Sequence, residues 1–256
     1  MRRLTLDPES EADVVGFEGM RVARQALEGV PPTAWRVVGG WMVRAWVEGG
    51  PTKGTARPTI DVDLALFPGR GRPAIARVPE RLADANLLPH EEPFRLRRSD
   101  GVLIDLLVPP GGSRADPPRI GKQLLFLAEG AAFAFELPPE QVGARLGRRK
   151  TEFLIPRLAA ALVHKTLVLV AMRPRYMVDA SDVALLLAVL RRESEDAIED
   201  LRRHRRRSDV RKALAALGGL FGDEAARGAI WVEHELGTRA AVTSVDDARW
   251  LLSQTV

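Results

Sequence analysis

Cysteine is absent from this chain of 256 residues. Its absence excludes a disulfide framework, a thiolate metal site and a catalytic cysteine nucleophile. The chain also lacks a long apolar run, because its most apolar stretch, LAAALVHKTLVLVAM, has Lys165 at its centre and is too short to cross a bilayer. No apolar segment follows the two arginines near the N-terminus, so no secretory signal is indicated. We therefore expect a cytoplasmic protein with no membrane contact.

Aromatic residues and lysines are scarce. Aromatics make up 5% of the chain, with a single tyrosine, so the basic segments lack the interleaved aromatic side chains of a base-stacking platform. The positive charge is carried almost entirely by arginine, and the net charge of +4 is compatible with nucleic-acid contact without establishing it. The chain is long enough for one large domain or two small ones.

The chain divides into two parts of different pattern. Up to about Glu140, short apolar runs alternate with turn signals, whereas beyond Thr151 the apolar residues follow a helical period. We therefore predict an α/β (α+β) fold, with a mixed sheet in a domain over residues 1–150 and a helical C-terminal domain over residues 151–256. In the second part, helices are expected near residues 156–171, 179–191, 194–204, 209–217 and 242–253.

Capping and turn residues divide the first part into elements. A helix with Asp7 as its N-cap and Pro8 at its first position is predicted near the N-terminus. AWRVVGG is typical of a short strand, WMVRAWV of a short helix and TIDVDLALF of a second strand, with another helix expected over residues 75–86. FRLRRSDGVLIDLLVP predicts a hairpin with a two-residue turn at Asp100-Gly101. QLLFLAEGAAFAFEL fits a helix or a strand.

Three aspartates stand inside apolar strand sequences. Asp61 and Asp63 are two residues apart in TIDVDLALF, so their side chains point to the same face of a strand. If the strand GVLIDLLVP, which carries Asp105, lies beside theirs, three carboxylates converge on one patch, and divalent cations that prefer oxygen relieve their repulsion. Two Mg²⁺ ions about 4 Å apart are the usual arrangement for nucleotidyl displacement, so we predict a Mg²⁺ site here, with Mn²⁺ as the alternative ion. The opposing interpretation is that Asp105 faces solvent or pairs with an arginine.

Gly39 and Gly40 lie between a predicted strand and a predicted helix. Glycines let the backbone approach a ligand closely, and a helix N-terminus offers N–H donors to a phosphate. A Gly-Gly pair is also an ordinary tight turn. Its meaning comes from the order: strand, Gly-Gly, helix, loop, strand with Asp-x-Asp, and a later strand with a third aspartate.

This order resembles that of the nucleotidyltransferase superfamily of the DNA polymerase β type. In particular, the chain resembles the AbiEii-like branch, the toxins of type IV toxin–antitoxin systems, which includes the MenT-type toxins. The resemblance rests on VVGGWMVRAW, RPTIDVDLAL, GVLIDLLVP and LVHKTLVLVAMRPRYMVDASDVALLL, in this order between Trp35 and Leu187. The positions that match the branch's Arg-x-Thr-x-Asp-x-Asp string and its helical lysine, arginine and aspartates are Arg57, Thr59, Asp61, Asp63, Lys165, Arg173, Asp179 and Asp182.

The resemblance implies a polymerase β-like core with a role for each matched residue. Gly39 and Gly40 would hold the triphosphate of an NTP, and Asp61 and Asp63 would ligate both metal ions. Asp105 would complete the second metal site and favour deprotonation of the attacking hydroxyl, as a general base or through the metal.

The remaining matched residues are expected at the nucleotide. Lys165 would contact the phosphates as a compact cation, although a lysine on an apolar helix often extends to solvent instead. Arg57 and Thr59 belong to the same predicted nucleotide site. Arg173 and Asp182 would bind substrate, or else form an ion pair between two helices.

Asp179 has a separate expected role, and the chain differs from the family's pattern at two positions. Asp179 directly precedes ASDVALLL, which predicts that it caps that helix. Trp41 stands where a small residue commonly follows the glycine pair, and Val178 stands where a lysine commonly precedes the first helical aspartate. An indole at position 41 could crowd a phosphate or stack on a base.

The stretch LRRHRRRSDVRK holds seven Arg and Lys residues against one aspartate. The basic part, Arg202 to Lys212, could bind the phosphates of tRNA or another polynucleotide. It could equally be a solvated helix end followed by a basic linker. Both interpretations stay open.

The resemblance implies the function. It implies Mg²⁺-dependent transfer of a nucleoside monophosphate from an NTP to RNA, in particular the 3′ end of tRNA, by a toxin with a cognate antitoxin. Two alternatives remain: a nucleotidyltransferase that modifies a small molecule such as an antibiotic, or a protein hydroxyl, and a non-catalytic protein that binds nucleotide or RNA.

Overall fold

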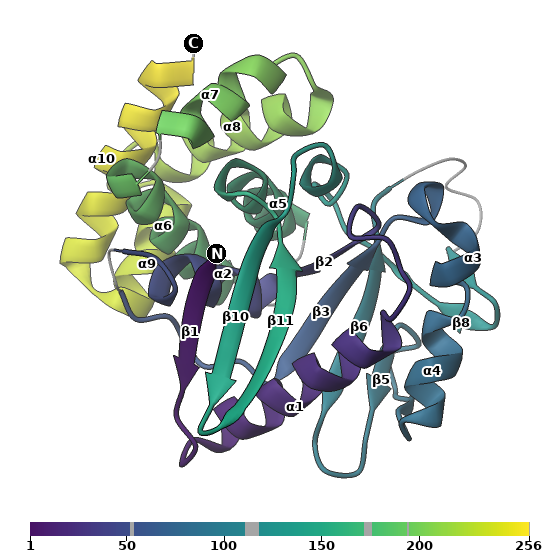
Figure 1. Ribbon diagram of the computed structural model, residues 1–256. Helices are drawn as coiled ribbons and strands as arrows, with labels where there is room; N and C mark the ends of the chain where they lie inside the picture. The colour runs from purple at the N-terminus through teal and green to yellow at the C-terminus, as the bar shows by residue number, and fades with distance from the viewer. Residues whose placement is uncertain (52–53, 111–117, 172–175, 194, 256) are drawn as a thin grey trace.

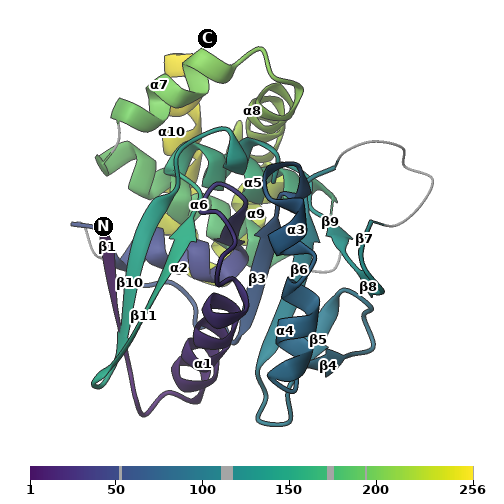
Figure 2. The ribbon, with the colours of Figure 1, turned by 45° about the vertical axis from the view of Figure 1, so that its right-hand side comes forward.

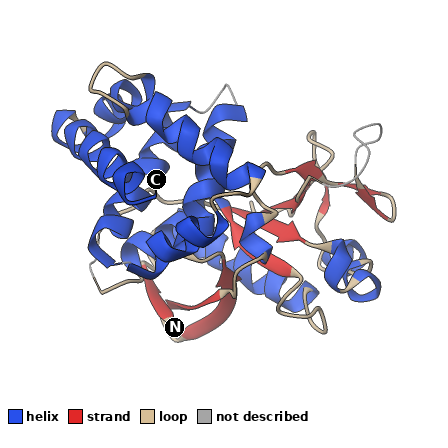
Figure 3. Cartoon of the chain, turned by 90° about the horizontal axis from the view of Figure 1, so that it is seen from above, coloured by secondary structure: helices blue, strands red, loops and turns tan. Residues whose placement is uncertain are grey.

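The computed structural model describes residues 1–51, 54–110, 118–171, 176–193 and 195–255. Helices and strands are mixed along the chain, which confirms the α+β class. Figure 1 shows helices α6 to α10 together on one side of the strands, with α3 and α4 on the other side. Seen from above, the C-terminal helices likewise gather beside the strands (Figure 3).

A mixed sheet lies at the centre of the first half of the chain. Its order is β2-β3-β6-β5-β4. Strand β9 also pairs with β6, at the end of β6 beyond the part that pairs with β5. β3 and β6 run parallel, whereas β2 is antiparallel to β3 and β5 is antiparallel to β6. The strands, with a small separate pair given last, are β2 (Trp35–Val38), β3 (Asp61–Leu66), β4 (Leu88–Pro89), β5 (Arg95–Arg97), β6 (Leu103–Val108), β9 (Phe126–Leu127), β7 (Arg119–Ile120) and β8 (Gln123–Leu124).

A second sheet consists of β1 (Arg2–Leu6), β10 (Glu140–Leu146) and β11 (Arg149–Ile155). Helix α1 (Glu11–Ala26) lies between the two sheets and contacts both (Figure 2). The approach is close at Gly16, where a Cβ would lie 2.8 Å from the backbone oxygen of Thr59. Packing between the sheets therefore explains a glycine inside a helix, where this residue is otherwise destabilising.

Further helices pack against the strands or lie between them along the chain. Helix α2 (Gly39–Glu48) follows β2 directly and contacts both β3 and α6. Short helical segments precede or flank the later strands of the mixed sheet: η1 (Pro68–Arg70), α3 (Arg72–Ile75), α4 (Val78–Asp84) and η2 (Phe133–Phe135). The C-terminal helices are α5 (Leu158–Ala171), α6 (Tyr176–Glu193), α7 (Glu195–His204), α8 (Ser208–Phe221), α9 (Arg227–Leu236) and α10 (Thr238–Thr255).

Helix α5 is the central helix of the second half. Its residues from Leu158 to Leu167 are all buried, because α6, α7, α8, α2 and η2 pack around it. An apolar surface on all sides is what such an enclosed helix requires. One continuous cluster of buried apolar side chains includes residues of both sheets and of these helices. Within the described residues, no helix combines the length and apolar character needed to cross a membrane.

Several predicted elements are confirmed, with shifted boundaries. The strand, Gly-Gly, helix and Asp-x-Asp strand occur in the predicted order, and β5 and β6 form the predicted antiparallel hairpin. The first helix begins later than predicted, because Ser10 rather than Asp7 is its N-cap and accepts from the backbone N–H of Asp13. The helix expected over residues 75–86 is two short helices, α3 and α4.

Other elements were not predicted from the sequence. These are β1, the hairpin of β10 and β11, and α9. Strand β11 continues past residue 150 to Ile155, so the second sheet extends across the position at which the helical part was expected to begin. The stretch QLLFLAEGAAFAFEL, which fitted helix or strand, contains short strands and the 3₁₀ helix η2.

Candidate active site

A cavity of about 310 Å³ lies where the mixed sheet meets the C-terminal helices. Its walls come from β3, β6 and β5, from the start of α2, and from α5 and α6. The residues predicted for the site that line this cavity are Gly39, Gly40, Arg57, Asp61, Asp63, Asp105 and Lys165. Asp179, which was predicted only as a helix cap, lines it as well, whereas Thr59 and Asp182 are not among its lining residues. Residues that are up to about 140 positions apart in the sequence thus line one cavity.

The three strand aspartates face the same cavity. Asp63 on β3 and Asp105 on β6 are direct partners in the parallel register of these strands. Asp61, two residues before Asp63, points to the same face because side chains alternate along a strand. All three line the cavity. The three carboxylates therefore converge on one cavity, as predicted.

Asp105 is also paired with an arginine, as the opposing interpretation expected. Arg95 lies directly across from it in the hairpin register, and its Nε and one terminal nitrogen each donate to a carboxylate oxygen of Asp105 at 2.7 Å. Arg95 also pairs with Glu92 at 3.0 Å. Burial raises the pKa of Asp105, while the hydrogen bonds from Arg95 act in the opposite direction. The hydrogen bonds to Asp105, and after them the charge of that carboxylate, raise the pKa of Arg95, which stays cationic.

The carboxylate oxygens of the three strand aspartates are the kind of ligand that Mg²⁺ and Mn²⁺ favour. In the described part of the chain, however, no three histidine or carboxylate side chains are arranged so that they could hold a metal ion. Arg95 already engages both oxygens of Asp105. A metal ion that uses this carboxylate would have to replace Arg95 as its partner.

Gly39 allows Asp63 to lie against the start of α2. Gly39 has a φ of 64°, in the left-handed region that favours glycine, and a Cβ there would lie 1.7 Å from Oδ2 of Asp63. Gly40 follows with a similar restriction, since its Cβ would lie 2.9 Å from Oγ1 of Thr59. Val38 provides no side-chain hydrogen bond as the N-cap of α2. The start of this helix is thus a narrow space beside the carboxylate of Asp63 and the hydroxyl of Thr59, and the free N–H groups of a helix N-terminus favour an anion.

Thr59 and Arg57 support the site from its edge. The hydroxyl of Thr59 donates to Oδ1 of Asp61 at 2.6 Å, and Thr59 itself is buried. Thr59 therefore orients a carboxylate, although it was predicted to belong to the nucleotide site. Arg57 lines the cavity with a partly exposed side chain and lies 3.7 Å from Asp182. Because its side chain is exposed and borders the cavity, the guanidinium can contact a ligand there.

Lys165 joins α5 to α6. Its ammonium lies 3.1 Å from Asp179 and 2.7 Å from Asp182, and it is only 4% exposed. Burial lowers the pKa of Lys165, but the charges of Asp182 and Asp179 outweigh this effect and hold the pKa above its ordinary value. Lys165 is therefore buried next to anions and does not extend to solvent. It also lines the cavity, where its charge faces the strand aspartates.

The predicted role of Asp179 as a helix cap is wrong. Helix α6 begins at Tyr176, so Asp179 lies within its first turn and accepts a hydrogen bond from Lys165. Asp182 does form an ion pair between two helices, but its partner here is Lys165, whereas the prediction had paired it with Arg173. Arg173 lies outside the described residues.

Trp41 does not enter the cavity. It is fully buried, its ring packs against Phe153 edge to face, and it fills the space that a Cβ of Gly16 would occupy. The expected crowding of a phosphate by this indole is therefore absent, because the side chain points from α2 into the core between the sheets.

Sequence reasoning missed the apolar wall of the cavity and its histidine. Phe94 and Phe126 contact each other with ring centroids 5.1 Å apart, and both line the cavity. His164 also lines it, and its Nδ1 donates to the backbone oxygen of Glu129 at 3.0 Å. Burial, and secondly the charge of Lys165, lowers the pKa of His164 to about 4, so the ring is neutral near pH 7.

Comparisons of the chain with models of protein families, with curated proteins and with solved structures found no match.

Proposed function

We propose that this chain is a Mg²⁺-dependent nucleotidyltransferase with a polymerase β-like core. In the proposed reaction it transfers a nucleoside monophosphate from an NTP to a hydroxyl of RNA. The observation that carries the proposal is the pairing of Asp63 with Asp105 in adjacent parallel strands, with Asp61 on the same face, beside the cradle at Gly39. The sequence resemblance to AbiEii-like toxins supports the same activity.

Each polar group of the cavity has a task in this reaction. The hydroxyl oxygen of the acceptor forms a bond to the α-phosphorus of the NTP, the bond from that phosphorus to the β-phosphate oxygen breaks, and pyrophosphate leaves. Asp105 accepts the proton of the attacking hydroxyl, which a carboxylate within hydrogen-bond reach can do. Asp61 and Asp63 present the oxygens that would hold Mg²⁺, and a bound ion would supply a Lewis acid for the phosphate oxygens.

The positive groups bind the phosphates. The backbone N–H groups at the start of α2, beside Gly39 and Gly40, face an anion with the positive end of the helix dipole. Arg57 contributes a guanidinium at the edge of the cavity and Lys165 an ammonium from α5. These groups stabilise negative charge on the phosphates as the pyrophosphate leaves, which is the kind of preorganised electrostatic effect that accelerates such reactions.

The RNA acceptor and the toxin role rest on the sequence resemblance. We propose the 3′ end of tRNA as the acceptor, because the AbiEii-like branch includes toxins of this type. Modification of that end would block translation, and a cognate antitoxin would restrain it. Expression of the wild-type chain is then expected to arrest growth, whereas the Asp61→Asn, Asp63→Asn variant is expected to permit it.

The direct test is a transfer assay. The protein is incubated with Mg²⁺, total tRNA and each of the four NTPs labelled at the α-phosphate, and the product is analysed by gel and mass spectrometry. We expect labelled RNA with at least one NTP, and at least a hundredfold loss in the Asp61→Asn, Asp63→Asn variant. The control Asp246→Asn removes an exposed aspartate far along the sequence, on α10, and is expected to keep full activity.

The outcomes separate the alternatives. Label on a small molecule or a protein in place of RNA would keep the chemistry and replace the acceptor. Tight NTP binding without turnover would indicate a non-catalytic nucleotide-binding protein. Full activity of the double variant would refute the proposed role of the strand aspartates.

A further inference from the structure

The arginine-rich stretch of the sequence lies at the junction of α7 and α8. Helix α7 ends at His204 and α8 begins at Ser208, and three arginines of this junction and of the first turn of α8 line an open groove of about 560 Å³. Leu252 and Thr255, near the C-terminal end of α10, form its other side. Figure 1 shows α7, α8 and the C-terminal end of α10 together at the top of the molecule.

The arginines of this stretch fall into two groups. Some have partners: the side chain of Arg202 donates to the backbone oxygen of Gln254, and Arg207 pairs with Asp209 at 3.0 Å. By contrast, the groove arginines are exposed and, within the described residues, their side chains have no recorded hydrogen bond or ion pair; they are Arg205, Arg206 and Arg211. Among the residues that the structure describes, no carboxylate side chain lines the groove.

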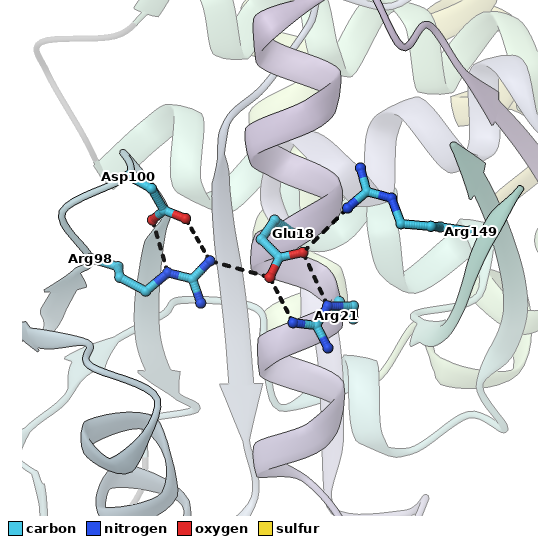
Figure 4. A network of polar contacts seen from close by, with 5 residues as sticks. All are labelled: Glu18, Arg21, Arg98, Asp100 and Arg149. Carbon is cyan, nitrogen blue, oxygen red and sulfur yellow. Dashed lines mark hydrogen bonds and ion pairs between the residues drawn. The ribbon is translucent and has the colours of Figure 1, made fainter. Parts of the chain in front are cut away.

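The other arginine-rich surface of the molecule shows the contrasting case. On α1, Glu18 accepts from Arg21 at 2.7 Å and Arg98 at 3.3 Å, and lies 3.8 Å from Arg149 (Figure 4). Arg98 has a second carboxylate partner, Asp100, to which it donates a hydrogen bond at 2.7 Å. These arginines join α1 to the β5–β6 hairpin and to β11, so they serve the fold. The groove arginines join nothing, and three guanidinium groups without carboxylates attract an anion from solution.

A polyanion backbone fits the groove better than a protein does. Protein interfaces depend on large aromatic or aliphatic anchors, whereas the apolar side chains that line this groove are Ala215 and two partly buried leucines, Leu214 and Leu252. Arginine, in contrast, matches the geometry of a phosphate with its planar donors. No aromatic side chain lines the groove either, so bases would not be stacked there.

We propose that the groove of Arg205, Arg206 and Arg211 binds the phosphodiester backbone of RNA independently of its sequence. The proposal rests on the proposed function in that it takes the acceptor to be RNA. The groove shares no residue with the active-site cavity. Helix α8 nevertheless contacts α5, which carries Lys165, so RNA in the groove is held at a fixed place relative to the cavity. The groove thus binds the body of the acceptor while its reacting hydroxyl lies in the cavity.

The test measures RNA binding without NTP. The dissociation constant of fluorescent RNA is measured by anisotropy over a series of salt concentrations, for the wild type and for Arg205→Gln, Arg206→Gln, Arg211→Gln. Each lost phosphate contact lowers the slope of log K against log salt by about 0.7 to 0.9, so the triple variant is expected to lose about 2 to 3 in slope. Two RNAs of unrelated sequence are expected to show the same loss.

A matched control removes the same charge elsewhere. Arg72, Arg77 and Arg239 are exposed. Arg72 and Arg77 lie at α3 and α4, and Arg239 lies in the first turn of α10, at the opposite end of that helix from Leu252 and Thr255. Their triple glutamine variant is expected to keep the wild-type slope. An unchanged slope in the groove variant, or an equal loss in both variants, would overturn the proposal and leave the groove to another anion, such as an acidic protein.

The outcome is independent of the transfer assay. Groove-dependent RNA binding in a protein that transfers no nucleotide would keep the groove and refute the proposed activity. Transfer to RNA with an unchanged slope in the groove variant would keep the activity and refute the groove. Thermal unfolding of each variant checks that the exposed substitutions leave the fold intact.

Discussion

Arg95 determines whether the carboxylate of Asp105 is available to a divalent cation, and replacing Arg95 tests this directly. In Arg95→Met the apolar stem of the side chain is retained, while both 2.7 Å hydrogen bonds to Asp105 and the pair with Glu92 are lost. Asp105 remains a buried carboxylate, 5% exposed, with no cation across the hairpin. The folded protein then carries an uncompensated charge.

The expected cost follows from the burial of the pair. Exposed ion pairs contribute about 0 to 1 kcal/mol, whereas removing one partner of a buried pair costs about 3 to 5 kcal/mol. The side chain of Arg95 is 17% exposed and that of Asp105 is 6% exposed, which places this pair between the two cases and nearer the second. We therefore expect Arg95→Met to lower the free energy of unfolding by about 2 to 3 kcal/mol at pH 7, without divalent cations.

The pH dependence has a definite sign. Burial already raises the pKa of Asp105, and loss of the hydrogen bonds from Arg95 raises it further. A carboxyl whose pKa is raised by folding makes the protein less stable as the pH rises through the window between the unfolded and folded pKa values. The difference between wild type and Arg95→Met is therefore expected to be smaller at pH 5 than at pH 7.

Divalent cations should reverse the loss. With Arg95 removed, Mg²⁺ no longer competes with a guanidinium for Asp105, so millimolar Mg²⁺ is expected to stabilise the variant more than the wild type. Urea unfolding with and without Mg²⁺ measures both quantities. Arg97→Met is the matched control, because Arg97 is exposed, lies on the same strand and pairs with Leu103. Equal stabilisation of wild type and variant by Mg²⁺ would refute the reasoning.

Two further predictions concern His164 and Gly39. The pKa of His164 is about 4 in the folded protein against an ordinary 6.5, so its contribution to stability is complete above about pH 6.5 and falls by up to about 3 kcal/mol as the pH drops towards 4. Urea unfolding from pH 4 to 7 should show a smaller decline for His164→Gln than for the wild type, and equal declines would contradict this cause. Gly39→Ala should reduce nucleotidyl transfer at least tenfold, because the new Cβ displaces the carboxylate of Asp63, one of the proposed metal ligands. Gly29→Ala is the control: its φ of 74° gives a comparable backbone strain, but the new Cβ has nothing within 4 Å, so this variant should keep its activity.

The carboxylate face was predictable because its causes are local. Alternation along a strand fixes that Asp61 and Asp63 share a face, whatever the surrounding fold. The apolar run around Asp105 indicated a neighbouring buried strand, and the parallel register of β3 and β6 then places it beside Asp63. Two short sequence patterns thus determine most of the acidic half of the site.

Helix starts were less predictable because several residues compete to cap them. Asp7 with Pro8 is a good start signal, but Ser10 also suits an N-cap and is the one that bonds the helix. Asp179 was misassigned for the same reason. A carboxylate in the first turn and a carboxylate at the cap are both favoured by the helix dipole, and only the contact with Lys165 on another helix separates the two.

The register of one hairpin explains why Arg95 was missed. A two-residue turn at Asp100-Gly101 would place Leu96 opposite Asp105. The backbone N–H of Arg98 instead bonds the oxygen of Val102, which makes a three-residue loop in which Gly101 has a φ of 92°. Loops of two and three residues are both common in hairpins, and a change of one residue moves every side chain to the other face. A charge rather than a leucine therefore faces the third carboxylate, so any metal ion that used Asp105 would compete with Arg95.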